Sequence, residues 1–384
     1  MSAKIKVVGV GGGGNKVIKR MVGRIQGVEF IAVNTDIQDL DECPSDVKLN
    51  IGQLTTKGLG SGGDPRVGQK SAEESYDAIR EALRDTDLVF VCAGMGGGTG
   101  TGASPIVAMV AREMGILTVG VVTKPFGFEG KHRMRNAEIG IKNLSKFVDC
   151  NIVVPNQKLV EKTKGGTTML QAFAIADDIL RQGVQCITDL ILKNMTINID
   201  FADIANVMRE SGIAHMGIGE ATGENRLLKA IQQAIHSPIL ETSIKHASQI
   251  IVSVHGGVDL AIHEVDNYVT LIKDVLDENC NMIFGANLHE DYNDRVQIII
   301  IATGFPNQEP RPQLMPRGTA HEIQIAPPPP TPFAQTIDSP NKDIIIEPKE
   351  PQRPVRLAPD FKIPEPNKKP EDVLPPFIRK MRGG

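Results

Sequence analysis

The sequence predicts an α/β protein whose larger part is a doubly wound, mostly parallel sheet. Short, continuously apolar runs alternate with helical segments through the first half of the chain. Continuous rather than alternating apolar runs are typical of strands that are buried on both faces of a parallel sheet. Glycine-rich loops follow three of these runs, and doubly wound folds place their ligands at the carboxyl ends of strands.

Six segments are predicted to be strands of this sheet. They are Ile5–Val10, Phe30–Val33, Val47–Ile51, Leu88–Ala93, Leu117–Thr123 and Ile152–Pro155. Helices are predicted between them over Pro65–Arg84 and Pro105–Met114. Each of these helices would open on a proline, which suits a first helical turn because its missing N–H has no intrahelical partner there.

A long helix and a smaller domain are predicted next. Residues 170–194 form a helical segment, roughly 37 Å long at 1.5 Å per residue. This segment is apolar around much of its circumference, so it is expected to lie buried between two bodies. After it, a smaller α/β domain is predicted from the strands Ile250–Val254, Asp259–Ile262, Met282–Gly285 and Val296–Ala302 and a helix over His263–Asp277.

The composition changes sharply near residue 306. Of the 25 prolines among 384 residues, 19 lie at or after Pro306, whereas only three of the 38 glycines lie beyond it. Such a segment cannot bury enough apolar surface to fold alone, so 306–370 is predicted to be a disordered, Pro-rich linker. The last residues, 371–384, regain apolar and basic side chains, as a docking peptide or a solvated chain end would. The predicted units are therefore 1–169, 170–194, 195–305, 306–370 and 371–384.

Charge and cysteine content exclude several classes of protein. The formal net charge is −4, and residues 306–384 carry 12 Lys+Arg against 10 Asp+Glu, which leaves −6 on the rest. Neither part has the basic balance that nucleic-acid binding needs. The five cysteines are scattered and never form CxxC, which indicates a reducing compartment and no structural zinc. No apolar run approaches the roughly 20 residues of a membrane span, so the sequence predicts a cytosolic protein.

Three glycine clusters are the strongest functional signal. They are GVGGGGN (9–15), GLGSGG (58–63) and GMGGGTGTG (94–102), and each follows a predicted strand. Glycines let the backbone approach a phosphate, which free N–H groups and a helix dipole then hold. The first cluster alone fits a tight turn, or a nicotinamide dehydrogenase with Asp36 as its ribose-binding acid. Three clusters suit a triphosphate better, and GxxxxGK[ST] is absent from the sequence.

With GGGTGTG at 96–102, the chain resembles the tubulin/FtsZ superfamily over essentially residues 4–305, and within it the bacterial FtsZ proteins. The resemblance implies a GTPase that self-assembles head to tail into the cytokinetic ring filaments of bacterial cell division. It implies a cytoplasmic protein, placed at the division site under the membrane without inserting into it. It also implies GTP/GDP as ligand, with Mg²⁺ held mainly by phosphates and water rather than by a metal site of the protein.

The resemblance places the nucleotide on the glycine loops and on the segments NTD, TKPFGFEGKHR, PNQKL and AFAIADDIL. The implied binding residues are Gly11, Gly12, Gly13, Gly14, Asn15, Asn34, Asp36, Gly60, Gly62, Gly94, Gly96, Gly97, Gly98, Thr99, Gly100, Thr101, Gly102, Thr123, Pro125, Glu129, Arg133, Asn156, Phe173 and Asp178. Phe173 would stack on guanine and Asp178 would accept from its two adjacent donors, which adenine lacks. Taken alone, Phe173 would be interpreted as a core aromatic.

The segment NIDFAD at 198–203 resembles the FtsZ loop that completes the site of a neighbouring subunit. The resemblance implies that Asn198, Asp200 and Asp203 enter the next subunit's nucleotide pocket and position the attacking water. Such a contact is heterologous and open, which generates filaments. Asp200 before Phe201 is also good N-cap chemistry, and a nucleotide-binding scaffold without hydrolysis is the non-enzymatic alternative.

Three places depart from the family pattern, and one of them is Met195-Thr196, which precedes Asn198 where many relatives have Gly-Leu. Lys16 stands where FtsZ proteins usually carry Asn or a small polar residue, and it could contact a phosphate or point to solvent. In the C-terminal peptide, Leu374–Arg379 (LPPFIR) matches most of the FtsZ tail motif, but Val373 replaces its usual acid. The resemblance implies that Val373–Arg379 recruits membrane-tethering and regulatory division proteins.

Overall fold

A computed structural model describes residues 3–161, 167–192, 199–237, 239–240, 244–261, 263–265, 272, 276, 280–289, 292 and 294–306. Ten strands of this part form one sheet in the order β3-β2-β1-β4-β5-β6-β7-β10-β8-β9. The predicted docking peptide and all of the predicted linker except Pro306 lie outside the described residues and stay predictions.

The first six strands are parallel, as the sequence predicts. They are β1 (Ile5–Val10), β2 (Val28–Asn34), β3 (Val47–Asn50), β4 (Leu88–Gly94), β5 (Leu117–Lys124) and β6 (Cys150–Pro155). The chain runs outward from β1 to β3 and then returns to the other side of β1 with β4. The strand order therefore reverses between β1 and β4, which is where a doubly wound sheet opens a crevice at the carboxyl ends of its strands.

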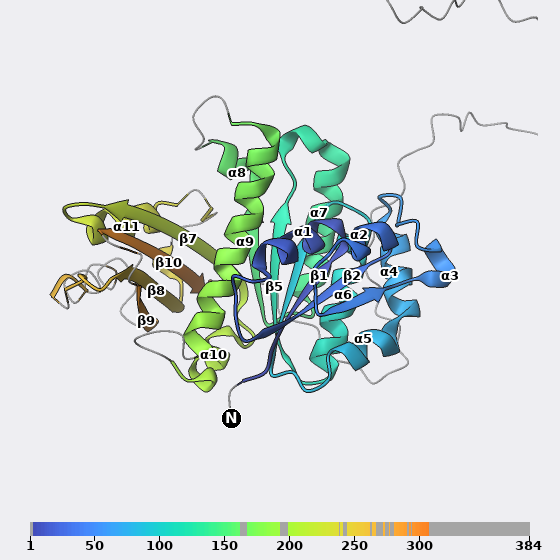
Figure 1. Ribbon diagram of the computed structural model, residues 1–384, viewed down its shortest axis with the longest axis horizontal. Coiled ribbons are helices and arrows are strands. Elements are labelled where there is room, and N and C mark those ends of the chain that lie inside the picture. Colours follow the sequence, from blue (N-terminus) through green and yellow to red (C-terminus); the bar gives the residue numbers. More distant parts are fainter. Residues whose placement is uncertain are drawn as a thin grey trace, which may run out of the picture. The chain divides into compact units, whose positions relative to one another are not determined.

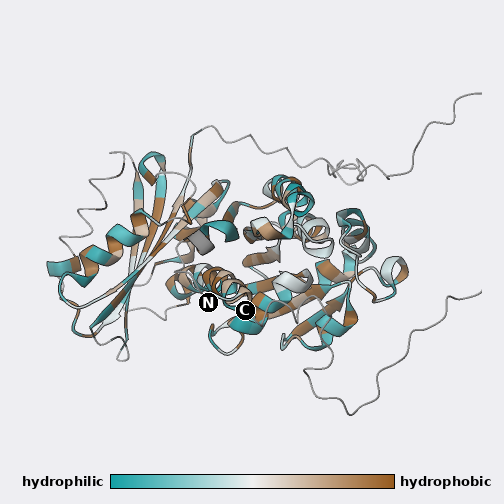
Figure 2. Cartoon of the chain, turned by 90° about the horizontal axis from the view of Figure 1, so that it is seen from above, coloured by the Kyte–Doolittle hydropathy of each residue, from teal (hydrophilic) through white to brown (hydrophobic). Residues whose placement is uncertain are grey.

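Helices cover both faces of this parallel sheet (Figure 1). One face packs against α1 (Gly11–Met21) and α9 (Met169–Ile191), whose apolar side chains share one core cluster. The other face packs against α5 (Tyr76–Ala82), α6 (Thr99–Glu113) and α7 (Lys131–Ser145) through a second cluster. In Figure 2 the strands between these layers are coloured mainly as hydrophobic, whereas the outer helices alternate. The shorter elements are α2 (Ile37–Asp41), α3 (Gln53–Thr56), α4 (Pro65–Glu74), η1 (Gly127–Glu129) and α8 (Asn156–Glu161).

Two helix predictions in this half were wrong in detail. The helix expected over Pro65–Arg84 is divided at Ser75, whose φ of −102° and ψ of 19° leave the helical region. The helix expected from Pro105 begins at Thr99, so Pro105 lies inside α6 rather than in its first turn. The glycines of GTGTG are therefore part of a helix start, because nearby packing compensates for their weak helix propensity.

Helix α9 confirms the long helix predicted over 170–194, of which residues 193 and 194 lie outside the described part. It begins with a reciprocal cap: Gln171 N donates to Thr168 Oγ1 at 3.3 Å, and Thr168 N donates to Gln171 Oε1 at 2.9 Å. Its buried side chains share a core cluster with β1, β4 and β5 on one side and with Ile251, Ile299 and Ile301 on the other. Figure 1 shows α9 between the two groups of strands.

The smaller part continues the sheet. After α10 (Phe201–Met208), β7 (Gly212–Thr222) pairs in parallel with β6 and antiparallel with β10 (Arg295–Thr303), which pairs with β8 (Gln249–Gly257). The edge strand β9 (Asn281–His289) runs parallel to β8. A third core cluster lies between these strands and α11 (Arg226–Ile235), and η2 (Ile244–His246) precedes β8.

The sequence predictions for this part were mixed. The strands expected at 250–254, 282–285 and 296–302 are confirmed and are longer than predicted. Asp259–Ile262 is not a strand, because the chain turns at Val258 and Asp259, and Ile262 lies outside the described residues. The helix expected over His263–Asp277 is described only in part, with 263–265 helical. None of the described helices is long and apolar enough to cross a bilayer.

Candidate functional site

A cleft of about 670 Å³ lies at the carboxyl ends of the parallel strands. Its walls come from α1, from the loop after β4, from the ends of β5 and β6, and from α9. This is the point where the strand order reverses, and its volume falls within the roughly 300–1,000 Å³ typical of small-molecule sites. The cleft is therefore the candidate ligand site.

The first and third glycine clusters pack against each other at the floor of this cleft. A Cβ built on Gly11 would lie 2.7 Å from Gly100 N, and one built on Gly13 would lie 3.1 Å from Gly94 Cα. Any side chain at these positions would push the two loops apart. By contrast, a Cβ on Gly97 would meet nothing within 4 Å, and Gly97 lines the cleft. The loops thus present bare backbone to the cleft, which suits an anion held by N–H groups.

Hydroxyl groups bring the second glycine cluster into the same place. Thr99 Oγ1, in the first turn of α6, lies 2.6 Å from Thr35 Oγ1 and 3.0 Å from Ser61 Oγ. Ser61 belongs to the loop 58–63, in which Gly60 and Gly62 have φ values of 85° and 60°. Those left-handed conformations favour glycine and bend the loop toward α6. Three segments distant in sequence therefore converge on the cleft.

An aromatic cluster forms the other end of the cleft. Phe126 is buried, and its ring stacks on Phe128 at 5.2 Å and meets Phe173 edge-on at 5.0 Å between centroids. Phe173 lines the cleft and remains 37 % exposed. A ring that has perpendicular neighbours and stays partly exposed at the cleft can stack on a planar base.

The structure corrects the prediction for Asp178. Asp178 accepts from Arg181 Nε and Gln182 Nε2, both at 2.7 Å, and does not line the cleft. Asp177 lines the cleft instead, one helical turn after Phe173. In a helix, residues four apart share a face whereas residues five apart do not. Asp177 is therefore the carboxylate that accompanies the Phe173 ring.

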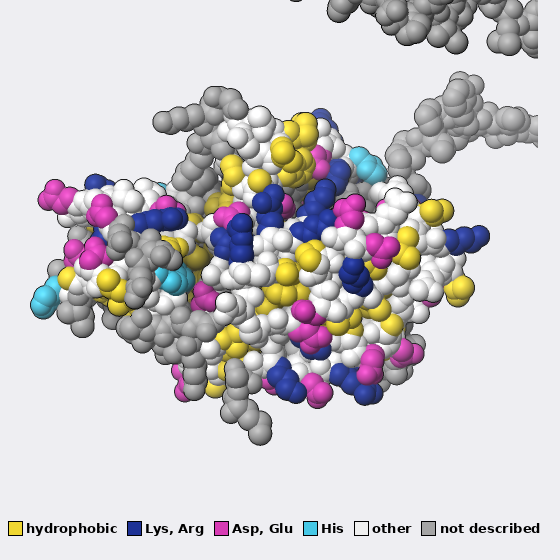
Figure 3. Space-filling view, viewed as in Figure 1, with side chains coloured by type: hydrophobic (Ala, Val, Ile, Leu, Met, Phe, Trp, Pro, Cys, Tyr) yellow, Lys and Arg dark blue, Asp and Glu magenta, His cyan; other side chains and the backbone are white. Residues whose placement is uncertain are grey.

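Asp177 is held by a cation from the facing helix. Arg20 Nε of α1 donates to Asp177 Oδ2 at 3.0 Å. Burial raises the pKa of Asp177, and the charge of Arg20 works against that rise. On the opposite wall, Glu129 accepts from Phe126 N at 2.8 Å and pairs with Arg133 Nε at 3.1 Å. Figure 3 shows Lys and Arg side chains gathered over α1 on this side of the molecule.

About half of the predicted binding residues line the cleft. They are Gly12, Gly13, Gly94, Gly97, Gly98, Thr99, Gly100, Thr123, Pro125, Glu129, Arg133, Asn156 and Phe173. The remaining ones do not line it: Gly11, Gly14, Asn15, Asn34, Asp36, Gly60, Gly62, Gly96, Thr101, Gly102 and Asp178.

Most residues of the second group shape the walls behind the cleft. Asp36 Oδ1 caps α2 by accepting from Gln38 N at 3.0 Å, and Thr101 Oγ1 accepts from Gly96 N at 2.8 Å. Asn15 differs, because its amide is buried and both of its polar atoms lack a partner among the described residues. Asn156 Oδ1, at the cleft, also lacks one. Unpaired buried amides are costly, so these two fit a site whose ligand completes the hydrogen bonding.

Sequence reasoning missed several lining residues. They are Val17, Lys19, Arg20, Ser61, Met95, Leu170, Ala176, Asp177 and Leu180, together with Lys16, to which no role was assigned. Most lie on α1 and α9 at helical spacing from Gly12 and Phe173, so the helical periodicity of these two segments would have found them.

The predicted catalytic acids lie at the far end of α9. Asp200 and Asp203 flank the start of α10, and both side chains are exposed. The side chain of Asp200 makes no cap hydrogen bond, so the capping interpretation does not account for it. Figure 1 shows α8 beside one end of α9 and α10 beside the other. Asn198 lies outside the described residues.

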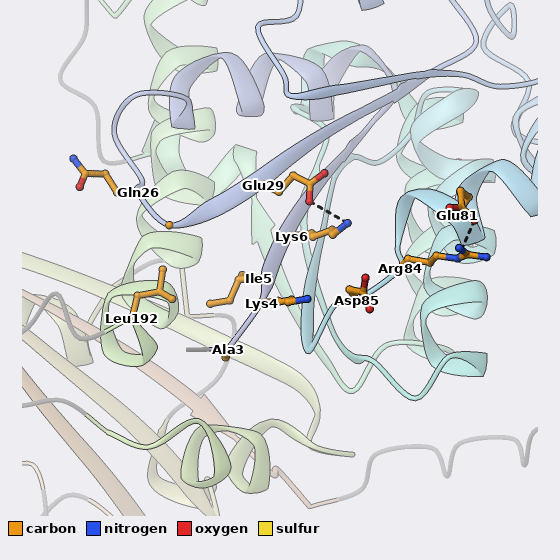
Figure 4. A pocket seen from close by; sticks show the side chains of 11 residues that line it. Ala3, Lys4, Ile5, Lys6, Gln26, Glu29, Glu81, Arg84, Asp85 and Leu192 are labelled. Carbon is orange, nitrogen blue, oxygen red and sulfur yellow. Dashed lines mark ion pairs between the residues drawn. The ribbon is translucent and has the colours of Figure 1, made fainter. Parts of the chain in front are cut away.

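A larger cavity of about 1000 Å³ lies at the opposite, amino-terminal edge of the parallel strands (Figure 4). Its charged side chains are already engaged, with Lys6 on Glu29 at 3.0 Å and Arg84 on Glu81 at 2.9 Å. None of the 15 glycines of the three clusters lines this cavity, and its only lining glycine is Gly27. The glycine-lined cleft of about 670 Å³ is therefore the better candidate for the ligand site. Within the described part of the chain, no three His, Cys, Asp or Glu side chains gather as a metal site.

Comparisons with known proteins agree with this geometry. The model of the tubulin/FtsZ family GTPase domain matches residues 4–164, and that of the FtsZ family C-terminal domain matches residues 212–306. A solved FtsZ dimer from M. jannaschii is 41 % identical, with a TM-score of 0.76, over 79 % of this chain and 89 % of that one. A point mutant of that protein matches equally, over 92 % of its own length.

A more distant structure shares the fold alone. A GTPγS-bound CetZ2 protofilament from Haloferax volcanii is 22 % identical, with a TM-score of 0.67, over 80 % of this chain and 94 % of that one. The FtsZ matches, by contrast, cover both the larger and the smaller part of the chain at 41 % identity, which establishes a common family. Membership of this family excludes the nicotinamide dehydrogenase alternative. The chain belongs to the tubulin/FtsZ family and is a GTPase of that family, which binds GTP and GDP.

Proposed function

We propose that this chain assembles head to tail into the cytokinetic filaments of bacterial cell division and hydrolyses GTP at the contact between subunits. The observation that carries the proposal is the separation of two half-sites. The glycine-floored cleft lies at one end of α9, and the acids Asp200 and Asp203 lie at the other. The solved relatives include an FtsZ dimer and a CetZ2 protofilament, so association of such chains has precedent.

In this proposal GTP lies along the cleft with its phosphates on the glycine loops. Backbone N–H groups around Gly12, Gly13 and Gly97 hold the phosphate oxygens, and the start of α1 adds a favourable dipole. Mg²⁺, held mainly by phosphates and water, would supply positive charge against the negative charge that develops during transfer. Glu129 and Arg133, which line the cleft, contact the ribose in this proposal.

Guanine lies at the aromatic end. The exposed face of Phe173 stacks on the ring, and Asp177 accepts from the two adjacent donors on the base edge. Arg20 holds the Asp177 carboxylate in place. Adenine offers an acceptor where guanine offers a donor, so the buried carboxylate would be left unpaired and adenine would be rejected.

A single subunit cannot complete this site. Ile199 N donates to Leu190 O at 3.3 Å, which places the segment before Asp200 beside the end of α9. Leu190 is 17 residues after Phe173 on one helix, which is roughly 25 Å at 1.5 Å per residue. Asp200 and Asp203 therefore serve a neighbouring subunit, whose bound GTP they approach from outside the cleft. There the carboxylates accept hydrogen bonds from water and aim its oxygen at the γ-phosphorus.

The first experiment is a dilution series. Phosphate release from GTP with Mg²⁺ is measured together with light scattering. Because the site forms between subunits, specific activity per subunit should rise above a threshold protein concentration. Activity that is independent of concentration would contradict the shared site.

The second experiment mixes two inactive variants. Asp203→Ala keeps its nucleotide cleft but lacks an acid, whereas Asp177→Ala keeps the acids but binds GTP poorly. Each should hydrolyse little alone. In a mixture, the acids of the Asp177→Ala chain should face the loaded cleft of the Asp203→Ala chain and restore part of the activity. No recovery in mixed filaments would refute the assignment of the two half-sites to different subunits.

The predicted tail completes the proposal. The peptide Val373–Arg379, outside the described residues, recruits membrane-tethering and regulatory division proteins and so holds filaments at the division site. A synthetic peptide covering 371–384 should compete with the full chain for these partners, and a peptide with Phe377→Ala should not. Equal competition by both peptides would remove the tail from the proposal.

A further inference from the structure

Four cationic side chains line the cleft, and three of them are already paired. The pairs are Lys19 with Glu42 at 3.0 Å, Arg20 with Asp177 at 3.0 Å, and Arg133 with Glu129 at 3.1 Å. Within the described part of the chain, the fourth cation, Lys16, has no ion pair and no side-chain hydrogen bond. Its ammonium is therefore the cleft cation that remains available to a ligand.

The position of Lys16 on α1 selects which part of the ligand it reaches. Lys16 is four residues after Gly12 and four before Arg20, so all three share one face of the helix. The Gly12 end of that face lines the cleft beside the glycine loops, whereas Arg20 holds Asp177 at the base end. Side chains on a helix lean toward its amino terminus, which directs Lys16 toward Gly12.

A lysine side chain is long enough to reach from position 16 to the Gly12 end of α1. Four residues along a helix span about 6 Å, which the four-carbon stem of lysine covers. The side chain is exposed, so it can adopt the rotamer that a ligand requires. The Lys16 charge is also felt at Asp177, where it opposes the rise in pKa that burial causes. Lys16 therefore lies between the phosphate floor and the base-reading acid.

We propose that the Lys16 ammonium pairs with an α- or β-phosphate oxygen of the bound nucleotide, an inference that rests on the proposed placement of GTP on the glycine loops. The backbone N–H groups of those loops bring no full charge, and the other cleft cations are neutralised by their carboxylates. Lys16 thus supplies the net positive charge of the site. Both GTP and GDP carry the α- and β-phosphates, so Lys16 tightens both and slows release of the product.

The test measures the dissociation constants of GTP, GDP and guanosine, below the assembly threshold, at low and at high salt. Lys16→Ala should weaken GTP and GDP roughly five- to tenfold, in line with one partly exposed charge-assisted hydrogen bond, and leave guanosine unchanged. The loss should shrink at high salt because salt screens exposed charges. Lys16→Arg should retain most of the affinity. Lys70→Ala, which removes an exposed lysine from α4 outside the cleft lining, is the matched control.

Each of the other possible results contradicts one part of the proposal for Lys16. Unchanged GTP and GDP affinity in Lys16→Ala would show that Lys16 points to solvent. An equal loss for guanosine would assign Lys16 to the base or to the fold, and melting curves of the variant would separate those two. A wild-type protein that binds guanosine as tightly as GTP would refute the phosphate floor itself, and with it the proposed function.

Discussion

Adjacent carboxylates on α9 show how strongly one residue of offset changes a side chain's role. Burial raises the pKa of Asp177, and Arg20 and, more weakly, Lys16 oppose that rise. Burial also acts on Asp178, but hydrogen bonds from Arg181 and Gln182 outweigh it, so the pKa of Asp178 is lowered. Asp178 already has its partners, whereas Asp177 keeps acceptor capacity directed into the cleft. The two residues therefore predict different consequences of mutation.

Substituting the two aspartates one at a time distinguishes them. Asp177→Ala should weaken GTP roughly 10- to 100-fold, because hydrogen bonds to a charged group are worth about 1.5–3 kcal/mol. Its preference for GTP over ATP should fall as well. Asp178→Ala should change GTP affinity less than about twofold, since a half-exposed ion pair contributes little. Competition binding with both nucleotides checks this, and the reverse ranking would restore Asp178 as the base reader.

Two glycines of the first and third clusters predict opposite effects of an added methyl group. The Cβ of Gly97→Ala would enter open cleft space, so the fold should persist while phosphate approach is blocked. The Cβ of Gly14→Ala would lie 2.4 Å from Cys92 O, so it should destabilise the protein by about 1–3 kcal/mol, as overpacking does. Thermal melting together with GTP binding separates the outcomes. A lowered melting temperature for Gly97→Ala would contradict the open position.

Sequence alone gave the chemistry of the site better than its geometry. The glycine clusters could be identified because their residue type and spacing suit phosphate binding, whereas only the resemblance to the tubulin/FtsZ superfamily pointed to Phe173 and Glu129. Asp177 was missed in favour of Asp178 because the motif holds two consecutive aspartates, and only helical phase chooses between them. Lys19 and Arg20 were missed because cations on an amphipathic helix look like an ordinary solvated face.

At the scale of the element, the buried part of α9 contains a carboxylate, that of Asp189, whose ionised form destabilises the fold. Asp189 is 7 % exposed, and burial raises its pKa to about 6, against the opposing effects of Gln185 and Arg181. Because the folded pKa lies above the unfolded one, the protonated carboxyl stabilises the fold below about pH 4. That stability is lost as the pH rises through 6.

Asp189→Asn should remove this pH dependence. At pH 7.5 the variant should melt a few degrees above the wild type, since a shift of about two units corresponds to roughly 3 kcal/mol at most. At pH 4.5 the difference should largely vanish. Melting curves at both values with GDP held constant provide the measurement. A variant less stable than the wild type at pH 7.5 would show that the carboxylate is satisfied when charged.

The predictions of strands were right where burial of the strand determines the structure. Five of the six parallel strands, β1, β2, β4, β5 and β6, are buried along most of their length, so hydrophobicity locates them, whereas the edge strand β3 is only partly buried. Strand β7 was missed because GIAHMGIGEAT contains three glycines and little continuous apolar sequence. Packing explains two of these glycines: a Cβ at Gly217 or Gly219 would lie 2.2 or 1.9 Å from a carbonyl oxygen of α11. Such close approach of helix and strand is a tertiary feature that no local pattern reveals.

At the scale of the whole molecule, composition separates the body of the chain from its tail. Of the 25 prolines, 19 lie at or after Pro306, and such a segment buries too little apolar surface to contribute to a folded core. A chain ending at Pro306 should therefore melt within about 1–2 °C of the full chain and keep the proposed concentration-dependent GTPase. A chain ending at Asn293 lacks β10 and should fail to fold. Loss of folding in the chain that ends at Pro306 would show that tail residues belong to the core.

The strand order also has a consequence for synthesis on the ribosome. Strands β1 to β6 pair with one another in parallel and leave the ribosome first, so the larger part can form while translation continues. Strand β7 then joins β6, but its other edge pairs with β10, which is synthesised after β8 and β9. Until then β7 presents an open edge, and an open edge invites pairing with other chains. The nascent protein is therefore most prone to aggregation during the interval between β7 and β10.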